Sequence, residues 1–130
     1  MLYGIGVDVT GLARFEAKQP GGHFTARVCG PQEQEELARL GPRRCTQRLA
    51  GCWAAKEAFL KAAGRGLGGF ALGEIQLLHR ASGQPYLHLT GGAAAWARGL
   101  GLTAQVSVSH DAGVCTAFVV LEQSDRERET

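Results

Sequence analysis

A strict alternation of side chains over residues 2–9 predicts the first β-strand of this 130-residue chain. One face of that strand would carry four apolar side chains: Tyr3, Ile5, Val7 and Val9. The opposite face would carry Gly4, Gly6 and, near the strand's end, Asp8. Because glycine has no side chain, another backbone segment or a ligand can approach this second face closely.

Helical patterns dominate the next part of the chain. Residues 11–28 are ambiguous, with a short helix over 11–18 as one interpretation. A proline suited to a first helical turn starts a helix predicted over 31–40. The strongest helical signal runs over 43–63, and a glycine-rich loop, GRGLGG, follows at 64–69.

The second half of the chain favours strands. Alternation and turn residues predict strands at 74–79, 85–90, 104–110 and 114–121, and an alanine-rich helix at 91–100. We therefore predict an α+β fold with a mainly antiparallel sheet packed against a long helix. A single domain over 1–122 would be followed by a charged tail at 123–130.

The distribution of charge is more informative than the total. A net charge of +2 does not by itself indicate nucleic-acid binding. Between residues 43 and 65, however, six cations face a single acid, Glu57: Arg43, Arg44, Arg48, Lys56, Lys61 and Arg65. This cluster fits an anionic substrate or partner. It also permits a nucleic-acid-binding domain, although the aromatic residues expected of a single-strand binder are scarce.

The remaining composition indicates a soluble, cytoplasmic protein. No apolar run approaches the ~20 residues needed to span a bilayer, and we recognise no signal peptide. The four cysteines form neither a CxxC pair nor a zinc-ligand spacing, so we expect free thiols: Cys29, Cys45, Cys52 and Cys115. We expect Cys52 and Cys115, which lie in apolar runs, to be packing residues.

Two acidic positions have both a structural and a chemical interpretation. Glu57 and Lys61 share a helix face, where they could form an ordinary exposed salt bridge. Followed by a glycine-rich loop, they could instead bind a diphosphate and its metal ion. Asp8 could form a turn or supply an oxygen ligand to Mg²⁺, which prefers one or two carboxylates plus phosphate oxygens and waters.

Five segments together resemble the holo-acyl-carrier-protein synthase family of phosphopantetheinyl transferases. The most specific is WAAKEAFLKA at 53–62, which is similar to the family's core motif. The others, in family order, are GIGVDV at 4–9, GRGLGG at 64–69, GQPYLHLTG at 83–91 and SVSH at 107–110. The resemblance covers residues 2 to about 121 and implies the fold predicted above.

The resemblance also implies an activity: transfer of 4′-phosphopantetheine from coenzyme A to a serine of an apo acyl carrier protein, with 3′,5′-ADP as the leaving product. Asp8 and Glu57 would hold Mg²⁺, and Lys61 would bind the phosphate under attack. Gly64 and Gly66 would let the loop approach the diphosphate.

Further roles follow from the same resemblance. Arg43, Arg44 and His110 would surround the adenosine end of coenzyme A with its 3′-phosphate, and Arg14 would contact the acidic carrier protein. The general base would be Glu57 or a metal-bound water. Family members form homotrimers with the coenzyme A site at the subunit interface.

One position departs from the family pattern. Cys52 stands where the family usually has an arginine, which we interpret as a lost phosphate contact that Arg48, one turn earlier, could replace. The change is the one feature favouring a catalytically silent module that binds carrier protein or nucleotide. The carrier served, fatty-acid or polyketide, and the tolerance for acyl-coenzyme A are not specified by the sequence.

Overall fold

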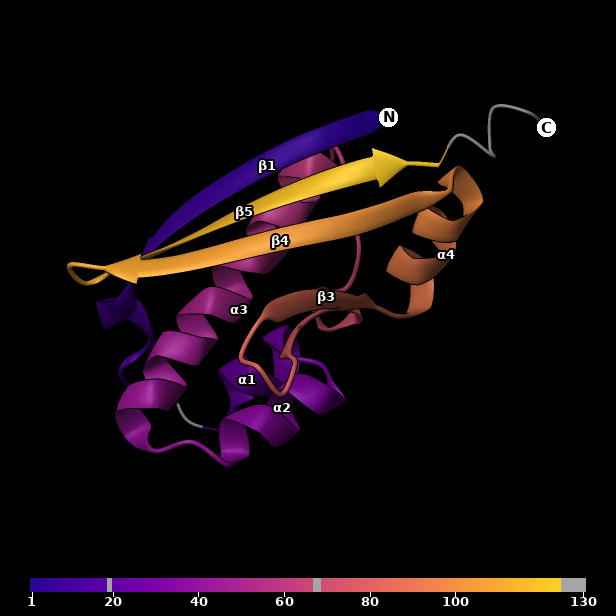
Figure 1. The fold of residues 1–130 in the computed structure, drawn as a ribbon. Helices are drawn as coiled ribbons and strands as arrows, with labels where there is room; N and C mark the ends of the chain where they lie inside the picture. Colours follow the sequence, from indigo (N-terminus) through magenta and orange to yellow (C-terminus); the bar gives the residue numbers. More distant parts are fainter. Residues whose placement is uncertain (19, 67–68, 125–130) are drawn as a thin grey trace.

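A computed structural model describes residues 1–18, 20–66 and 69–124 of the chain (Figure 1). Within these residues, five strands and four α-helices follow in the order β1, α1, α2, α3, β2, β3, α4, β4, β5. The strands are β1 Leu2–Gly11, β2 Ile75–His79, β3 Pro85–Leu89, β4 Leu102–Asp111 and β5 Val114–Gln123. The α-helices are α1 His23–Val28, α2 Pro31–Ala38, α3 Pro42–Ala62 and α4 Gly91–Leu100, with short 3₁₀ turns at Leu12–Phe15 and Leu72–Glu74.

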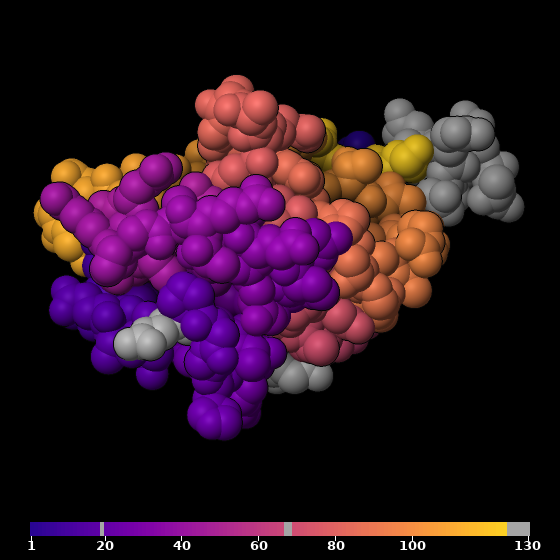
Figure 2. All heavy atoms as spheres, turned by 90° about the horizontal axis from the view of Figure 1, so that it is seen from below, coloured from indigo at the N-terminus to yellow at the C-terminus, as the bar shows by residue number. Residues whose placement is uncertain are grey.

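The main sheet is antiparallel, with strand order β1-β5-β4, and β2 and β3 form a separate two-stranded hairpin. The long helix α3 lies across one face of the main sheet (Figure 1). The shorter helices α1 and α2 lie on the far side of α3, where they and the start of α3 form much of the surface seen in Figure 2. This arrangement confirms the predicted α+β fold with an antiparallel sheet packed against a long helix.

The contact between β1 and α3 depends on glycine. A Cβ atom added at Gly4 would lie 2.0 Å from the carbonyl oxygen of Ala62, and one added at Gly6 would lie 2.0 Å from that of Ala58. Because no side chain fits there, the helix backbone packs directly on the strand. Of the two possibilities left open by the sequence, the glycine face of β1 therefore receives a backbone and not a ligand at these two positions.

The apolar face of β1 remains uncovered in the single chain. Ile5, Val7 and Val9 are each at least half exposed. On the neighbouring strand, Phe118 pairs directly with Val7 and is also exposed. The outer surface of the sheet is thus a contiguous apolar patch, which is uncommon on a protein that functions as a monomer.

The structure corrects the expectation for residues 11–28. β1 continues to Gly11 and is followed by a 3₁₀ turn, Leu12–Phe15, in place of a helix over 11–18. The short helix α1 was not predicted. The α3 prediction agrees within one residue at each end, and β5 extends to Gln123. Residues 125–130 of the expected tail lie outside the described residues.

Candidate active site

The approach of β1 to α3 brings three sequence-predicted site residues together. Asp8 follows Gly6 on the helix-facing side of β1, near Glu57 and Lys61 on α3. The Lys61 ammonium donates a hydrogen bond to the carbonyl oxygen of Val7 at 2.9 Å and lies 3.4 Å from the Asp8 carboxylate. The Lys61 side chain is 55% exposed, so its ammonium is still available to a ligand.

The two carboxylates repel each other. The pKa of Glu57 is raised, first by burial and then by the negative charge of Asp8, while Lys61 and Arg14 act in the opposite direction. A carboxylate pair that raises a pKa in this way becomes more stable when a cation is bound between its members. The interpretation of Glu57 and Lys61 as only a surface pair does not account for the Asp8 carboxylate beside them.

Arg14 borders the same centre. It is exposed on the 3₁₀ turn after β1, and its guanidinium donates a hydrogen bond to the Thr10 hydroxyl at 3.1 Å. Its guanidinium also lies 5.5 Å from the centre of the Trp53 ring. These contacts hold a cation at the rim of the carboxylate site, facing solvent.

The glycine-rich segment begins where α3 ends. Gly64 has a left-handed φ of 75°, which terminates the helix, and neither Gly64 nor Gly66 has another atom within 4 Å of an added Cβ. The backbone therefore faces open space, where a ligand could approach it. Between these two glycines, the Arg65 guanidinium lies over the Phe70 ring, 4.7 Å from its centre. Residues 67 and 68 of the expected loop lie outside the described residues.

A second group of predicted residues gathers around His110. Arg43 and His110 line one surface hollow of about 590 Å³, and Arg44 and His110 line a neighbouring one of about 250 Å³. The pKa of His110 is lowered, first by burial and then by the positive charge of Arg48. The imidazole is thus mainly neutral at pH 7 and lies in a positive field that suits an anion.

Sequence reasoning missed the network that holds Arg48. Its guanidinium donates to a Glu36 carboxylate oxygen at 2.8 Å. The same oxygen lies 2.9 Å from His79 Nδ1, and the other oxygen accepts from the His79 backbone N–H at 3.1 Å. Arg48 therefore lines the second hollow with its charge already partly engaged, linking α2, α3 and β2.

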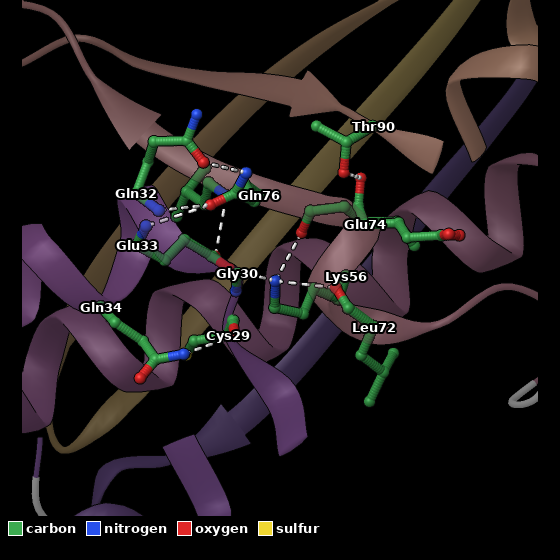
Figure 3. A network of polar contacts seen from close by, with 12 residues as sticks. Cys29, Gly30, Gln32, Glu33, Gln34, Lys56, Leu72, Glu74, Gln76 and Thr90 are labelled. Atoms are coloured by element: carbon green, nitrogen blue, oxygen red, sulfur yellow. Dashed lines mark hydrogen bonds and ion pairs between the residues drawn. The ribbon is translucent and has the colours of Figure 1, made fainter. Parts of the chain in front are cut away.

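The second lysine of the core motif does not belong to the exposed cation cluster. Lys56 is fully buried, and its ammonium lies 2.7 Å from the Glu33 carboxylate. It also donates to the backbone carbonyl of Leu72, as Figure 3 shows, and to that of Ile75. Glu33 in turn accepts from the backbone N–H groups of Gly30 and Leu77. Lys56 thus joins α3 to α2 and β2 and is not available to a substrate.

Cys52 also lies in the interior. It is 1% exposed and is close to Cys29, Glu33 and Lys56. The Cys52 side chain therefore lies beside the buried Glu33–Lys56 pair and lines neither surface hollow. This placement does not support the interpretation of Cys52 as a lost phosphate contact.

Comparison with known proteins gives a consistent result. Residues 4–117 match the family described as the 4′-phosphopantetheinyl transferase superfamily. The chain belongs to this superfamily. A relative from Lacticaseibacillus casei, named holo-[acyl-carrier-protein] synthase, is 37% identical over 132 residues, which cover 99% of this chain and 98% of the relative.

Solved structures of other phosphopantetheinyl transferases share the fold. A holo-[acyl-carrier-protein] synthase from Neisseria meningitidis superimposes with a TM-score of 0.83 at 32% identity, covering 95% of this chain and all of the other. One from Bacillus anthracis, in complex with coenzyme A (3′,5′-ADP), gives 0.80 at 31% identity, covering 95% and 99%. The suspected family and the class of enzyme, a phosphopantetheinyl transferase, are thereby confirmed.

Substitutions of the two lysines of the core motif should have opposite effects on stability and on activity. Replacing buried Lys56 by methionine leaves Glu33 charged and unpaired, so we expect a loss of about 3–5 kcal/mol in the free energy of unfolding, measured by urea titration. Replacing exposed Lys61 by methionine should cost less than about 1 kcal/mol. It should nevertheless lower the rate of phosphopantetheinyl transfer by about 100-fold or more, because we expect this cation to face the reacting phosphate. Equal stability losses in the two variants would contradict this assignment.

Proposed function

We propose that this transferase moves the 4′-phosphopantetheine group of coenzyme A onto a serine of an apo acyl carrier protein, leaving 3′,5′-ADP, and that it requires Mg²⁺. The observation that supports it best is the meeting of Asp8, Glu57 and Lys61 beside an open glycine backbone. Two acids, a cation and unhindered backbone suit a metal-bound diphosphate.

The residues present fit a magnesium ion. Asp8 and Glu57 are both partly exposed, and the pKa of Glu57 is raised first by burial and then by the negative charge of Asp8. Mg²⁺ commonly takes one or two carboxylates and completes its coordination with phosphate oxygens and water. When bound, the ion would withdraw negative charge from the diphosphate.

The chain's own residues would contribute positioning and charge. Lys61, which is fixed by Val7 and yet more than half exposed, would hold a non-bridging oxygen of the phosphate under attack. The carrier's serine hydroxyl would attack that phosphorus, and its proton would pass to Glu57 or to a water.

The adenosine end would bind around Arg43, Arg44 and His110, but the helix places this group away from Glu57. Arg43 and Arg44 lie in the first turn of α3, and Glu57 and Lys61 lie at least 13 residues later, so a rise of about 1.5 Å per residue separates the two groups by roughly 20 Å along the helix. A single ribose separates the 3′-phosphate of coenzyme A from its diphosphate. One molecule can therefore use both groups only if each comes from a different copy of the chain.

This separation supports a homotrimer with the site shared between neighbouring subunits. The exposed apolar face of β1 and β5 supplies the surface that such an assembly would cover. We also propose that Arg14, a solvent-facing cation at the rim, contacts an acidic carrier protein, whose association would then weaken with salt. Among the described residues, no helix is long and apolar enough to cross a bilayer. Cytoplasmic location remains an expectation.

A silent binding module loses its main support in the structure. Its one favourable feature was Cys52, and this side chain is in the core and does not line either hollow. A module that only binds would also have no need of a carboxylate pair beside Lys61.

Intact-mass spectrometry of an apo acyl carrier protein tests the proposed reaction. Incubation with the protein, coenzyme A and Mg²⁺ should add the mass of one phosphopantetheine group, and EDTA should prevent the addition. Asp8→Asn and Glu57→Gln should lose turnover while unfolding like wild type, because each removes a charged metal ligand from a partly exposed position. Wild-type turnover in either variant would exclude its metal role, and no mass gain with several carriers would refute the activity.

The adenosine end can be tested with 3′-dephospho-coenzyme A. Arg44→Ala should raise the KM for coenzyme A roughly tenfold, since a hydrogen bond to a charged group contributes about 1.5 kcal/mol or more. The KM for the dephospho compound should not change. Arg48→Ala tests in the same way whether Arg48 replaces the phosphate contact of the family's usual arginine. Arg98→Ala, on the exposed last turn of α4, is the control. An equal rise in KM for both substrates would show that the 3′-phosphate does not bind at this site.

Sedimentation analysis tests the assembly. Wild type should sediment with about three times the chain mass of 13.8 kDa. Phe118→Asp places a charge in the apolar patch and should give monomers without turnover, whereas Ser82→Asp in the hairpin turn should leave both properties intact. A fully active monomer would contradict the shared site.

A further inference from the structure

Two buried thiols lie side by side where the family pattern would place one arginine. The sulfur atoms of Cys29 and Cys52 and a carboxylate oxygen of Glu33 lie within 4.8 Å of one another. Cys29 follows α1 directly, and Cys52 is on the third turn of α3. The two cysteines are 3% and 1% exposed and both are free thiols.

The charges around these thiols argue against a metal ion. Glu33 already accepts from the Lys56 ammonium and from two backbone N–H groups, so its carboxylate has its hydrogen-bonding partners. A divalent cation at this point would be placed next to the buried ammonium of Lys56, which Figure 3 shows close to Glu33. Among the residues that the structure describes, only three ligand atoms converge here, whereas a structural zinc site needs four.

A disulfide would disturb none of these contacts. We propose that Cys29 and Cys52 form a reversible disulfide that links the α1–α2 junction to α3 when the protein meets a hydroperoxide. The product is uncharged, so the neutral Glu33–Lys56 pair is preserved in a site where an added charge would be costly. This inference does not depend on the proposed function.

The reaction balances with hydrogen peroxide as the oxidant. The Cys29 sulfur attacks one peroxide oxygen, the O–O bond breaks, and a sulfenic acid and one water result. The Cys52 sulfur then attacks Cys29, the S–O bond breaks, the S–S bond forms, and the Cys52 proton leaves with the oxygen as a second water. A dithiol reductant reverses the change by exchange.

Access determines the order and the rate of these steps. Cys29 connects two short helices of six and eight residues, which open more readily than the 21-residue α3 that holds Cys52. The pKa of Cys52 is raised well above the usual value, first by its hydrogen bond to Cys29 and then by burial. Cys29 therefore meets the oxidant first, and Cys52 resolves the intermediate slowly.

Mass spectrometry of the full-length protein identifies the bond. Each cysteine falls in a different tryptic peptide, because Arg27, Arg39, Arg44, Arg48 and Lys56 separate them. Treatment with hydrogen peroxide should lower the intact mass by about 2 Da, the two hydrogens lost, and link peptides 28–39 and 49–56. The melting temperature should rise by roughly 10 °C and return with dithiothreitol, because the bond closes a loop of more than 20 residues.

Matched variants separate this bond from general thiol oxidation. Cys52→Ser should lose the linked peptides and the thermal shift, whereas Cys115→Ser, which alters an equally buried thiol on β5, should keep both. A link from Cys29 to Cys45, which has its own surface hollow, would overturn the proposed pairing. Zinc bound to the purified protein at one ion per chain and released by a chelator would overturn it in favour of a metal site. Intact thiols after prolonged treatment would also refute it.

Discussion

Backbone-to-backbone packing of β1 on α3 is the contact on which the candidate site depends. At Gly4 and Gly6 the carbonyl groups of the helix occupy the space that any side chain would fill. Asp8, two residues further along the same face, is therefore brought to the helix flank that carries Glu57 and Lys61. A larger residue at Gly6 would move the strand outward and separate the two carboxylates.

The buried pair of Glu33 and Lys56 provides a second constraint, on another side of α3. Lys56 fixes α3 by donating to the carbonyl groups of Leu72 and Ile75, and Glu33 fixes the start of α2 by accepting from the backbone N–H of Leu77 on β2. Buried Gln76 adds hydrogen bonds to the first N–H groups of α2. A buried ion pair is weak evidence for net stability, but its directional hydrogen bonds specify one relative position of three elements. This position in turn sets Glu36, and hence Arg48, at the rim of the second hollow.

The sequence predicted correctly those elements that depend on local interactions, and it did not predict those that depend on distant contacts. The bounds of α3 could be predicted because its apolar spacing and its flanking glycines act locally. The helix α1 could not, because six residues are too few to be stable alone, and it is held by contacts such as Phe24 on Trp53. The alternation in β1 predicted a strand correctly, but no local signal shows which of the two faces a helix will cover.

The site shows the same division. The spacing of Glu57 and Lys61 indicates a shared face, yet the proximity of Asp8 depends on a strand some fifty residues away. The gathering of Arg43, Arg44 and His110 was expected only through the family resemblance. The buried state of Lys56 was missed because its partner, Glu33, lies 23 positions earlier with no periodic relation to it.

Helix geometry explains why two lysines five residues apart have unrelated tasks. Five residues correspond to a rotation of about 140°, so Lys56 and Lys61 must emerge on different sides of α3. One side is closed by α2 and β2, where a lysine can remain charged only beside an acid such as Glu33. The other side is bordered by the edge strand β1 and stays open. At position 52, on the closed side, arginine would add a second cation to a pair that is already neutral, whereas cysteine adds none. The change at Cys52 thus alters the charge of the interior and leaves the open flank, where we place the chemistry, untouched.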